Sequence, residues 1–83
     1  MNLDLLRTLG AVVKSGSINQ AAERLYKTQP AVSMAIKRLE QDAGFTIFDR
    51  NKYRLELTDK GRIFYEKTKV ILEQVSSLNS LTE

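Results

Sequence analysis

The run TQPAVSMAIKRL, from Thr28 to Leu39, contains the polar and basic side chains of this chain best suited to recognising a partner. Stepping 100° per residue from Val32 gathers the apolar members of the run within about 100° of arc. Those members are Val32, Ala35, Ile36 and Leu39, whereas Pro30, Met34 and Lys37 fall on the opposite side, flanked by Ser33 and Arg38. The run is therefore predicted to form a helix with one buried face and one face presented to a partner.

The side chains on the outer face favour DNA as that partner. A helix fits the major groove, where base edges show distinct donors and acceptors, and residues near its N-terminus reach deepest. Gln29 and Ser33 are predicted to read bases, although such residues are also common at the solvent-facing start of an ordinary helix. The residues before the helix, Arg24, Lys27 and Thr28, are placed to contact phosphates, which position a protein without reading sequence.

Positive charge is concentrated around this helix. The 83 residues include 13 Lys and Arg and 10 Asp and Glu, which gives a net charge of +3. From Arg24 to Arg54 there are seven basic residues and three acidic ones. Arg50, Lys52 and Arg54 are predicted to bind phosphate, although charges on edge strands also serve to prevent aggregation. Lys37 and Arg38 are predicted to face DNA from the helix, although such residues alone usually mark only a solvated helix face.

The composition argues against an enzyme and against a membrane or secreted protein. The chain has no histidine, the usual general base and metal ligand near neutral pH, and no cysteine for a disulfide or a thiolate site. No apolar run reaches the ~18 residues that span a bilayer. We therefore expect no catalytic residue, no cofactor and no metal, and a soluble protein of the cytoplasm.

Three helices are predicted before residue 45. Apolar spacing predicts the first over Leu3–Ser15, ended by Gly16, and Ser17 caps a short second one. The third is capped at Thr28 or Gln29, with Pro30 in its first turn, and runs to about Ala43 before Gly44. Tyr26, in the turn between the second and third helices, is expected to cover the core.

After Gly44 the periodicity changes to that of a hairpin and then returns to that of a helix. Phe45–Phe48 and Leu55 with Leu57 flank a polar centre, which predicts a β-hairpin with its tip near Asn51 and Lys52. Thr58 and Asp59 then begin a helix that runs about 24 residues to Leu81. Its apolar stripe extends past anything that a small domain can cover, so a dimer seam is predicted. The stripe consists of Phe64, Thr68, Ile71, Val75 and Leu78.

Gly16–Gly61 resembles the DNA-binding domain of LysR-type transcriptional regulators. Four motifs carry the resemblance: AAERL, TQPAVS followed by IKRLE, FDR, and LTDKG. The resemblance implies a mainly α fold with a small β-hairpin, namely a winged helix-turn-helix domain over residues 1–57 and a linker or dimerisation helix over 58–83. It also implies the residues that enter the major groove, with Arg50 reaching DNA from the wing. The groove residues are Gln29, Pro30, Ala31, Ser33 and Arg38.

The resemblance further implies a regulator that binds an interrupted inverted repeat of double-stranded DNA as a homodimer, or as a higher oligomer when full length. Such regulators carry a C-terminal domain that binds a small-molecule inducer, so the chain is expected to be a fragment. Two positions depart from the family: Met34 stands where arginine is common, and Lys52 where glycine is frequent. Met34 is either exposed filler or a contact to a thymine methyl group. The alternative function is a protein-interaction module that dimerises through its last helix.

Overall fold

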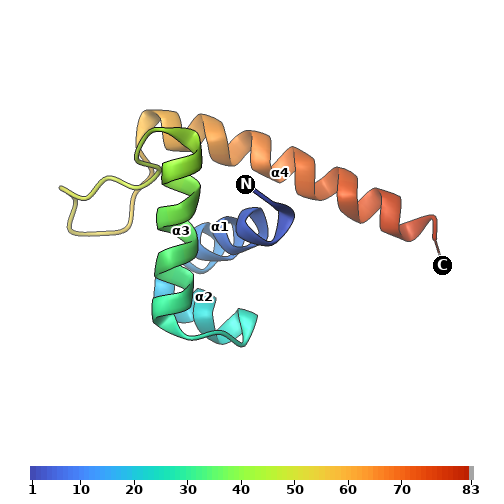
Figure 1. The fold of residues 1–83 in the computed structure, drawn as a ribbon, viewed down its shortest axis with the longest axis horizontal. Coiled ribbons are helices and arrows are strands. Elements are labelled where there is room, and N and C mark those ends of the chain that lie inside the picture. Colours follow the sequence, from blue (N-terminus) through green and yellow to red (C-terminus); the bar gives the residue numbers. More distant parts are fainter. Residues whose placement is uncertain (83) are drawn as a thin grey trace.

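Four helices make up most of the chain, and the first three pack around a shared core (Figure 1). In the computed structural model, which describes residues 1–82, they are α1 (Leu3–Ser15), α2 (Ile18–Leu25), α3 (Gln29–Ala43) and α4 (Asp59–Ser80). α4 extends away from the other three and lies along the longest dimension of the molecule, 44 Å. None of these helices is long and apolar enough to cross a membrane. The expected mainly helical fold is confirmed.

Side-chain caps fix where each helix begins. The Asn2 carboxamide accepts a hydrogen bond from the Leu5 amide at 2.9 Å, and the Ser17 hydroxyl accepts one from the Gln20 amide at 3.0 Å. Thr28 caps α3 by accepting from the Ala31 amide at 3.2 Å, which decides between the two predicted positions. Each such cap contributes about 1 kcal/mol to stability. α1 and α3 end at Gly16 and Gly44 as predicted.

α2 also ends at a residue in the left-handed conformation, but this residue is Tyr26, whereas α1 and α3 end at glycines. The φ of Tyr26 is 55°, and it is the only residue other than glycine with positive φ among those described. Its amide donates to the Glu23 carbonyl at 3.2 Å, while the next amide, of Lys27, donates to the Ala22 carbonyl at 2.9 Å. The Tyr26 side chain is 97% exposed. The expectation that it covers the core is wrong, because the left-handed turn directs it into solvent.

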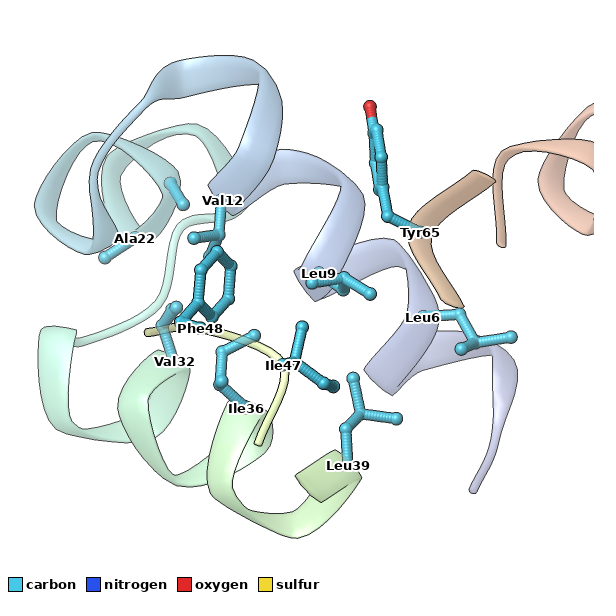
Figure 2. Packing of buried hydrophobic residues seen from close by; sticks show 11 residues of the cluster. Leu6, Leu9, Val12, Ala22, Val32, Ile36, Leu39, Ile47, Phe48 and Tyr65 are labelled. Carbon is cyan, nitrogen blue, oxygen red and sulfur yellow. The ribbon is translucent and has the colours of Figure 1, made fainter. Parts of the chain in front are cut away.

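The core joins α1 and α3 to the segment that follows α3. Figure 2 shows Ile47 and Phe48 among the apolar side chains of the two helices. Ile47 is completely buried and Phe48 is 7% exposed. The inward-facing residues predicted on α3 are confirmed for Val32, Ile36 and Leu39, while Ala35 is half-buried. The inner face of α3 is therefore anchored, which holds its outer face in a fixed orientation.

The wing, residues 45–58, makes much less β-structure than a hairpin of two strands. Its arms pair at a single antiparallel bridge, between Phe48 and Leu57, with the Asp49 amide donating to the Glu56 carbonyl at 2.8 Å. No strand forms elsewhere in the described residues. The predicted hairpin is corrected in this respect, because residues 50–56 are all exposed and have no buried face to hold a longer ladder in register.

The start of α4 packs against the first arm of the wing, at Thr46 and Ile47. The Thr58 amide donates to the Ile47 carbonyl at 2.9 Å, and the Thr58 hydroxyl donates to the Thr46 carbonyl at 2.7 Å. Gly61 packs so closely that a Cβ there would lie 2.1 Å from the Ile47 carbonyl oxygen. The glycine of the LTDKG motif therefore allows backbone to pack on backbone.

The first half of α4 also packs on α1, whereas its second half extends free of the helical unit. Tyr65 is 9% exposed and Thr68 is 1% exposed, and both lie on the side of α4 that faces α1. Further along, Leu78 is 62% exposed. The predicted helix end at Leu81 is close to the observed end at Ser80. The division at residue 58 stays a prediction, and Glu83, the last residue of the second predicted domain, lies outside the described residues.

Candidate nucleic-acid interface

The outer face of α3 is open to solvent along its length. Pro30, Lys37 and Arg38 are exposed, and Met34 is 70% exposed. Because the opposite face of the helix is buried, these side chains project outward from a fixed backbone. All the residues predicted to enter a major groove lie on α3, and Thr28, which caps the helix, immediately precedes the first of them.

Gln29 and Ser33, the predicted base readers, lie one turn apart and contact each other. The Gln29 Nε2 donates to the Ser33 hydroxyl at 2.9 Å. Gln29 keeps its amide oxygen and its second N–H hydrogen for a partner, which is the pair of groups that glutamine uses with adenine. Gln29 is exposed and Ser33 is half-buried, so the contact orients an accessible carboxamide.

A polar groove of about 730 Å³ separates α3 from the wing. It brings together six of the predicted DNA-binding residues from two segments that are distant in sequence. These are Gln29, Ser33 and Lys37 of α3 and Arg50, Lys52 and Arg54 of the wing. Four of the six are basic, so the groove attracts a polyanion. Basic side chains therefore line the groove on both sides, from α3 and from the wing.

The groove is also lined by Ser17 and Asn19 from the start of α2, which the sequence analysis did not assign to a binding site. The hydroxyl of Ser17 caps α2 by accepting from the Gln20 amide, so this residue has a structural role as well. Asn19 is exposed and one residue into the helix. The only sequence signal for them was the start of a helix next to the basic segment.

The remaining predicted contacts lie outside this groove. Arg24 is exposed on α2, and Pro30, Ala31, Met34 and Arg38 are exposed on α3. The Lys27 ammonium pairs with the Asp4 carboxylate at 3.0 Å, which ties the turn before α3 to the start of α1. The Lys27 charge is thus partly balanced within the chain, while that of Arg24 is not balanced by any ion pair among the described residues.

Arg38, on α3, is also paired within the chain, with Asp42. The Asp42 carboxylate pairs with the Met1 amino group at 2.8 Å and with the Arg38 Nε at 3.5 Å. The hydrogen bond from the Met1 amino group and the positive charge of that group, followed by the attraction of Arg38, lower the pKa of Asp42 below its ordinary value. Asp42 is thus an exposed residue that also forms two ion pairs.

Glu40 is a third acidic residue near the interface, and its role was missed. Its side chain is 9% exposed, and it accepts hydrogen bonds from the Ile47 amide at 2.8 Å and from the Arg50 guanidinium. The amino-acid sequence alone assigned Glu40 no role. Its place four residues after Ile36, at the edge of the buried face of α3, was the signal that could have identified it.

The residues of the predicted dimer seam on α4 differ in their exposure to solvent. Thr68 is buried within the protomer and its hydroxyl donates to the Phe64 carbonyl at 2.8 Å, so it is not open to a partner. Phe64 is half-buried and contacts Phe45 edge to face, with ring centroids 6.1 Å apart. Ile71 and Leu78 are exposed and Val75 is half-buried. The structure adds three exposed apolar residues that the stripe did not include: Ile63, Val70 and Leu81.

The fold and the groove together define a winged helix-turn-helix domain of the DNA-binding class. Residues 3–62 match the family model described as "Bacterial regulatory helix-turn-helix protein, lysR family". The chain therefore belongs to the LysR family of transcriptional regulators and corresponds to their DNA-binding part. The family match also confirms a regulator and not an enzyme.

Individual relatives agree with this assignment. The HTH-type transcriptional regulator YtlI of Bacillus subtilis is 45% identical over 78 residues, which cover 94% of this chain and 25% of the relative. A probable RuBisCO transcriptional regulator of Cyanidioschyzon merolae is 43% identical over 70 residues, covering 84% of this chain and 23% of the relative. The chain thus spans about a quarter of the length of these relatives.

Solved structures of the same family superpose closely. The DNA-binding domain of BenM in complex with catB site 1 DNA has a TM-score of 0.93 at 33% identity, over 99% of this chain and 88% of that one. The DNA-binding domain of CbnR in complex with DNA has a TM-score of 0.88 at 30% identity, over 99% of this chain and 94% of that one. Full-length OxyR of Pseudomonas aeruginosa has a TM-score of 0.92 at 31% identity, over 100% of this chain and 28% of that one.

Proposed function

We propose that this LysR-family domain reads a specific sequence in double-stranded DNA by inserting α3 into the major groove while the wing contacts the adjacent backbone. The groove between α3 and the wing carries this proposal, because it combines two hydrogen-bonding side chains, Gln29 and Ser33, with four basic ones. The similar domains of BenM and CbnR, whose structures are solved in complex with DNA, support DNA as the partner.

The residues divide into two roles in this proposal. Gln29 and Ser33 contact base edges, with Pro30, Ala31 and Met34 beside them on the same exposed surface. The basic residues contact phosphates, whose neutralisation releases counterions and makes binding depend steeply on salt. They are Arg24, Lys27, Lys37, Arg38, Arg50, Lys52 and Arg54, together with the Thr28 hydroxyl. We expect the second group to set affinity and the first to set preference among sequences.

The domain acts as a homodimer joined through α4. Ile63, Val70, Ile71 and Leu78 lie within about 100° of arc around that helix, and their exposed fractions range from 43% to 62%. An apolar stripe of this kind on a helix that extends beyond its domain is typical of a helix–helix interface. Phe64 and Val75, both half-buried, border it. Two such domains would bind the two halves of an interrupted inverted repeat.

The complete regulator is larger than this domain. Because the relatives are about four times as long as the part that matches, an inducer-binding domain after α4 and a higher oligomer in the full-length protein belong to the proposal. We place its action in the bacterial cytoplasm, where its DNA target lies. A small molecule would act only through that further domain.

A protein-interaction module is the second candidate, and the exposed apolar stripe of α4 is the observation that favours it. The two functions differ in what the basic face does. If α3 binds DNA, changing both Lys37 and Arg38 to alanine should weaken binding to duplex DNA in a mobility-shift assay. An unchanged shift would favour the interaction module.

Selection of preferred sites from a random duplex pool tests the proposed function directly. We expect a palindromic consensus and an affinity for it that exceeds that for random duplex by about 10³-fold or more. Binding should weaken with salt along a log–log slope that counts the phosphates contacted. If no sequence is enriched, or if the enriched sequence binds no better than random duplex, sequence reading by α3 is excluded.

A further inference from the structure

Glu40 connects the recognition helix to the wing through both of its carboxylate oxygens. Oε2 accepts hydrogen bonds from the Ile47 amide at 2.8 Å and from the Phe48 amide at 3.4 Å. Oε1 accepts from the terminal Nη2 of Arg50. One oxygen therefore fixes the backbone at the base of the wing, and the other fixes a side chain that points toward the groove.

Burial makes this arrangement rigid. The Glu40 side chain is 9% exposed, in contact with the core that holds Ile47 and Phe48. A carboxylate removed from water is stable only when its oxygens are hydrogen-bonded, and bonds from a guanidinium are among the strongest that it can accept. Glu40 cannot leave these partners without exposing an unpaired charge to the core. Its position on α3 thus sets the position of the Arg50 guanidinium.

Arg50 is held on one side and free on the other. Its side chain remains 64% exposed although it is paired, and it lines the groove beside α3. A guanidinium has five N–H donors in a planar fork, and the contact to Glu40 uses the Nη2 group. The remaining donors have no hydrogen-bond partner among the described residues, so they are available to a phosphate.

We propose that Glu40 is a positioning residue for DNA binding, which holds the Arg50 guanidinium in the orientation that a phosphate of the bound duplex requires. The inference rests on the proposed contact between Arg50 and DNA. An exposed arginine that is already ordered loses less side-chain entropy on binding than a free one. The negative charge of Glu40 opposes this gain, but it lies behind the guanidinium, so a phosphate in front of Arg50 is closer to the positive charge than to the negative one.

Glu40→Gln separates the two functions of the carboxylate. Its amide oxygen can still accept from the Ile47 amide, but its NH₂ group then faces Arg50, where a donor meets a donor. The wing base is retained while Arg50 is released. Glu56→Gln is the matched control, because it removes the same charge from the wing at an exposed carboxylate that pairs with no described basic residue.

The test is a double-mutant cycle in DNA affinity, measured on the duplex that the wild-type chain selects from a random pool. We expect Arg50→Ala to weaken binding about tenfold and Glu40→Gln to weaken it about three- to fivefold. In the Glu40→Gln background, Arg50→Ala should cost only about two- to threefold, whereas in the Glu56→Gln background it should cost the full tenfold. Far-UV circular dichroism with heating checks that each variant is folded.

The outcomes distinguish failure of this inference from failure of the proposed wing contact. If Arg50→Ala weakens binding by the same factor in the wild-type and the Glu40→Gln backgrounds, the two residues act independently. Glu40 is then only structural, and the inference is overturned. If Arg50→Ala alone changes nothing, the proposed wing contact is wrong and the inference falls with it.

A second measurement needs no change at Glu40 and so does not depend on the folding of that variant. In the wild-type protein, NMR of arginine Nη–H groups, with Arg50 assigned by its loss in Arg50→Lys, reports rotation of the guanidinium. We expect hindered rotation both in the free protein and on DNA. Fast averaging in the free protein would overturn the inference, because Glu40 would then hold nothing in place.

Discussion

Tyr26 ends α2 in a backbone conformation that costs an L-amino acid with a bulky side chain about 1–2 kcal/mol. Nothing in the protomer compensates for this cost through packing, because the side chain is 97% exposed. Asparagine adopts the same conformation more readily. We therefore expect Tyr26→Asn to stabilise the domain by about 0.5–1 kcal/mol, which corresponds to a rise in Tm of about 3–6 °C.

Tyr53→Asn is the matched control for Tyr26, since Tyr53 is also fully exposed but has an ordinary φ. Its thermal unfolding should match that of the wild type within about 0.5 kcal/mol. A Tyr26→Asn protein that melts at a lower temperature than both would show that the tyrosine ring contributes a contact in solution.

Met34 is exposed in the middle of the face proposed to enter the major groove. Methionine neither neutralises a phosphate nor forms a bidentate contact to guanine. We expect Met34→Arg to tighten binding to duplex DNA, to increase the salt slope by about one unit, and to change the preferred base at one position. Site selection with the two proteins in parallel measures this. Identical consensus sequences and identical salt slopes would remove Met34 from the interface.

Helical periodicity could assign residues to the inner or the outer face of α3, but it could not identify partners. Val32, Ile36 and Leu39 were placed correctly because burial follows the helical angle. The partners of Glu40 are the amides of residues 47 and 48, in a segment whose path depends on the whole core. The exposure of Tyr26 was also missed, because an aromatic residue in a turn gives no sequence signal for a left-handed conformation.

Among the elements, the wing and α4 meet at a close backbone contact between Ile47 and Gly61. A Cβ on Gly61 would lie 2.1 Å from the Ile47 carbonyl oxygen, so Gly61→Ala must push α4 away from the wing or the wing away from the core. We expect a loss of about 3 kcal/mol in the free energy of unfolding, measured with urea. DNA affinity should fall as well, because Ile47 lies at the base of the wing.

Gly10 provides the matched control, since it is also a helical glycine. A Cβ there would lie 3.5 Å from the Leu72 Cδ1, which is an ordinary contact. Gly10→Ala should therefore be neutral or stabilise the domain by up to about 1 kcal/mol. If the two alanine variants lose equal stability, the close approach at Gly61 is not what holds the wing.

α4 is the element proposed to join two domains. Ile71→Asp or Leu78→Asp places a charge in its exposed apolar stripe, so we expect monomers in sedimentation velocity and weaker binding, because the second half-site is lost. Ser76→Asp adds the same charge on the opposite side of the helix and should leave the dimer intact. Dimers that persist in both stripe variants would exclude α4 as the seam.

The structure of α4 also shows why its stripe was only partly predicted. Heptad-like spacing groups Phe64 and Thr68 with Ile71 and Leu78, but α1 covers the first part of the helix and leaves the second part exposed. Where α1 ends relative to α4 is a property of the tertiary fold. Sequence spacing therefore predicted that α4 has an apolar face, but not which residues of that face remain open.

For the whole molecule, the small domain separates its tasks in space. The buried side of α3 joins the core, its outer side and the wing form a basic groove, and the far end of α4 extends away from the other helices, where we propose that a second copy binds. The four motifs predicted this plan because each marks a local feature: a cap, a buried face, the base of the wing, or a close backbone contact. The groove itself could be found only from the structure, since its lining residues come from segments 16–19, 29–37 and 48–55.

The central claim is that α3 reads sequence while the wing binds the backbone, and competition binding tests it most directly. Wild type, Gln29→Ala and Arg50→Ala are each titrated with the selected duplex and a scrambled one over a range of salt. Gln29→Ala should cost about 1–3 kcal/mol on the selected duplex alone, whereas Arg50→Ala should weaken both duplexes and lower the salt slope by about one. Equal losses on both duplexes for Gln29→Ala, with no change in selectivity, would contradict the account.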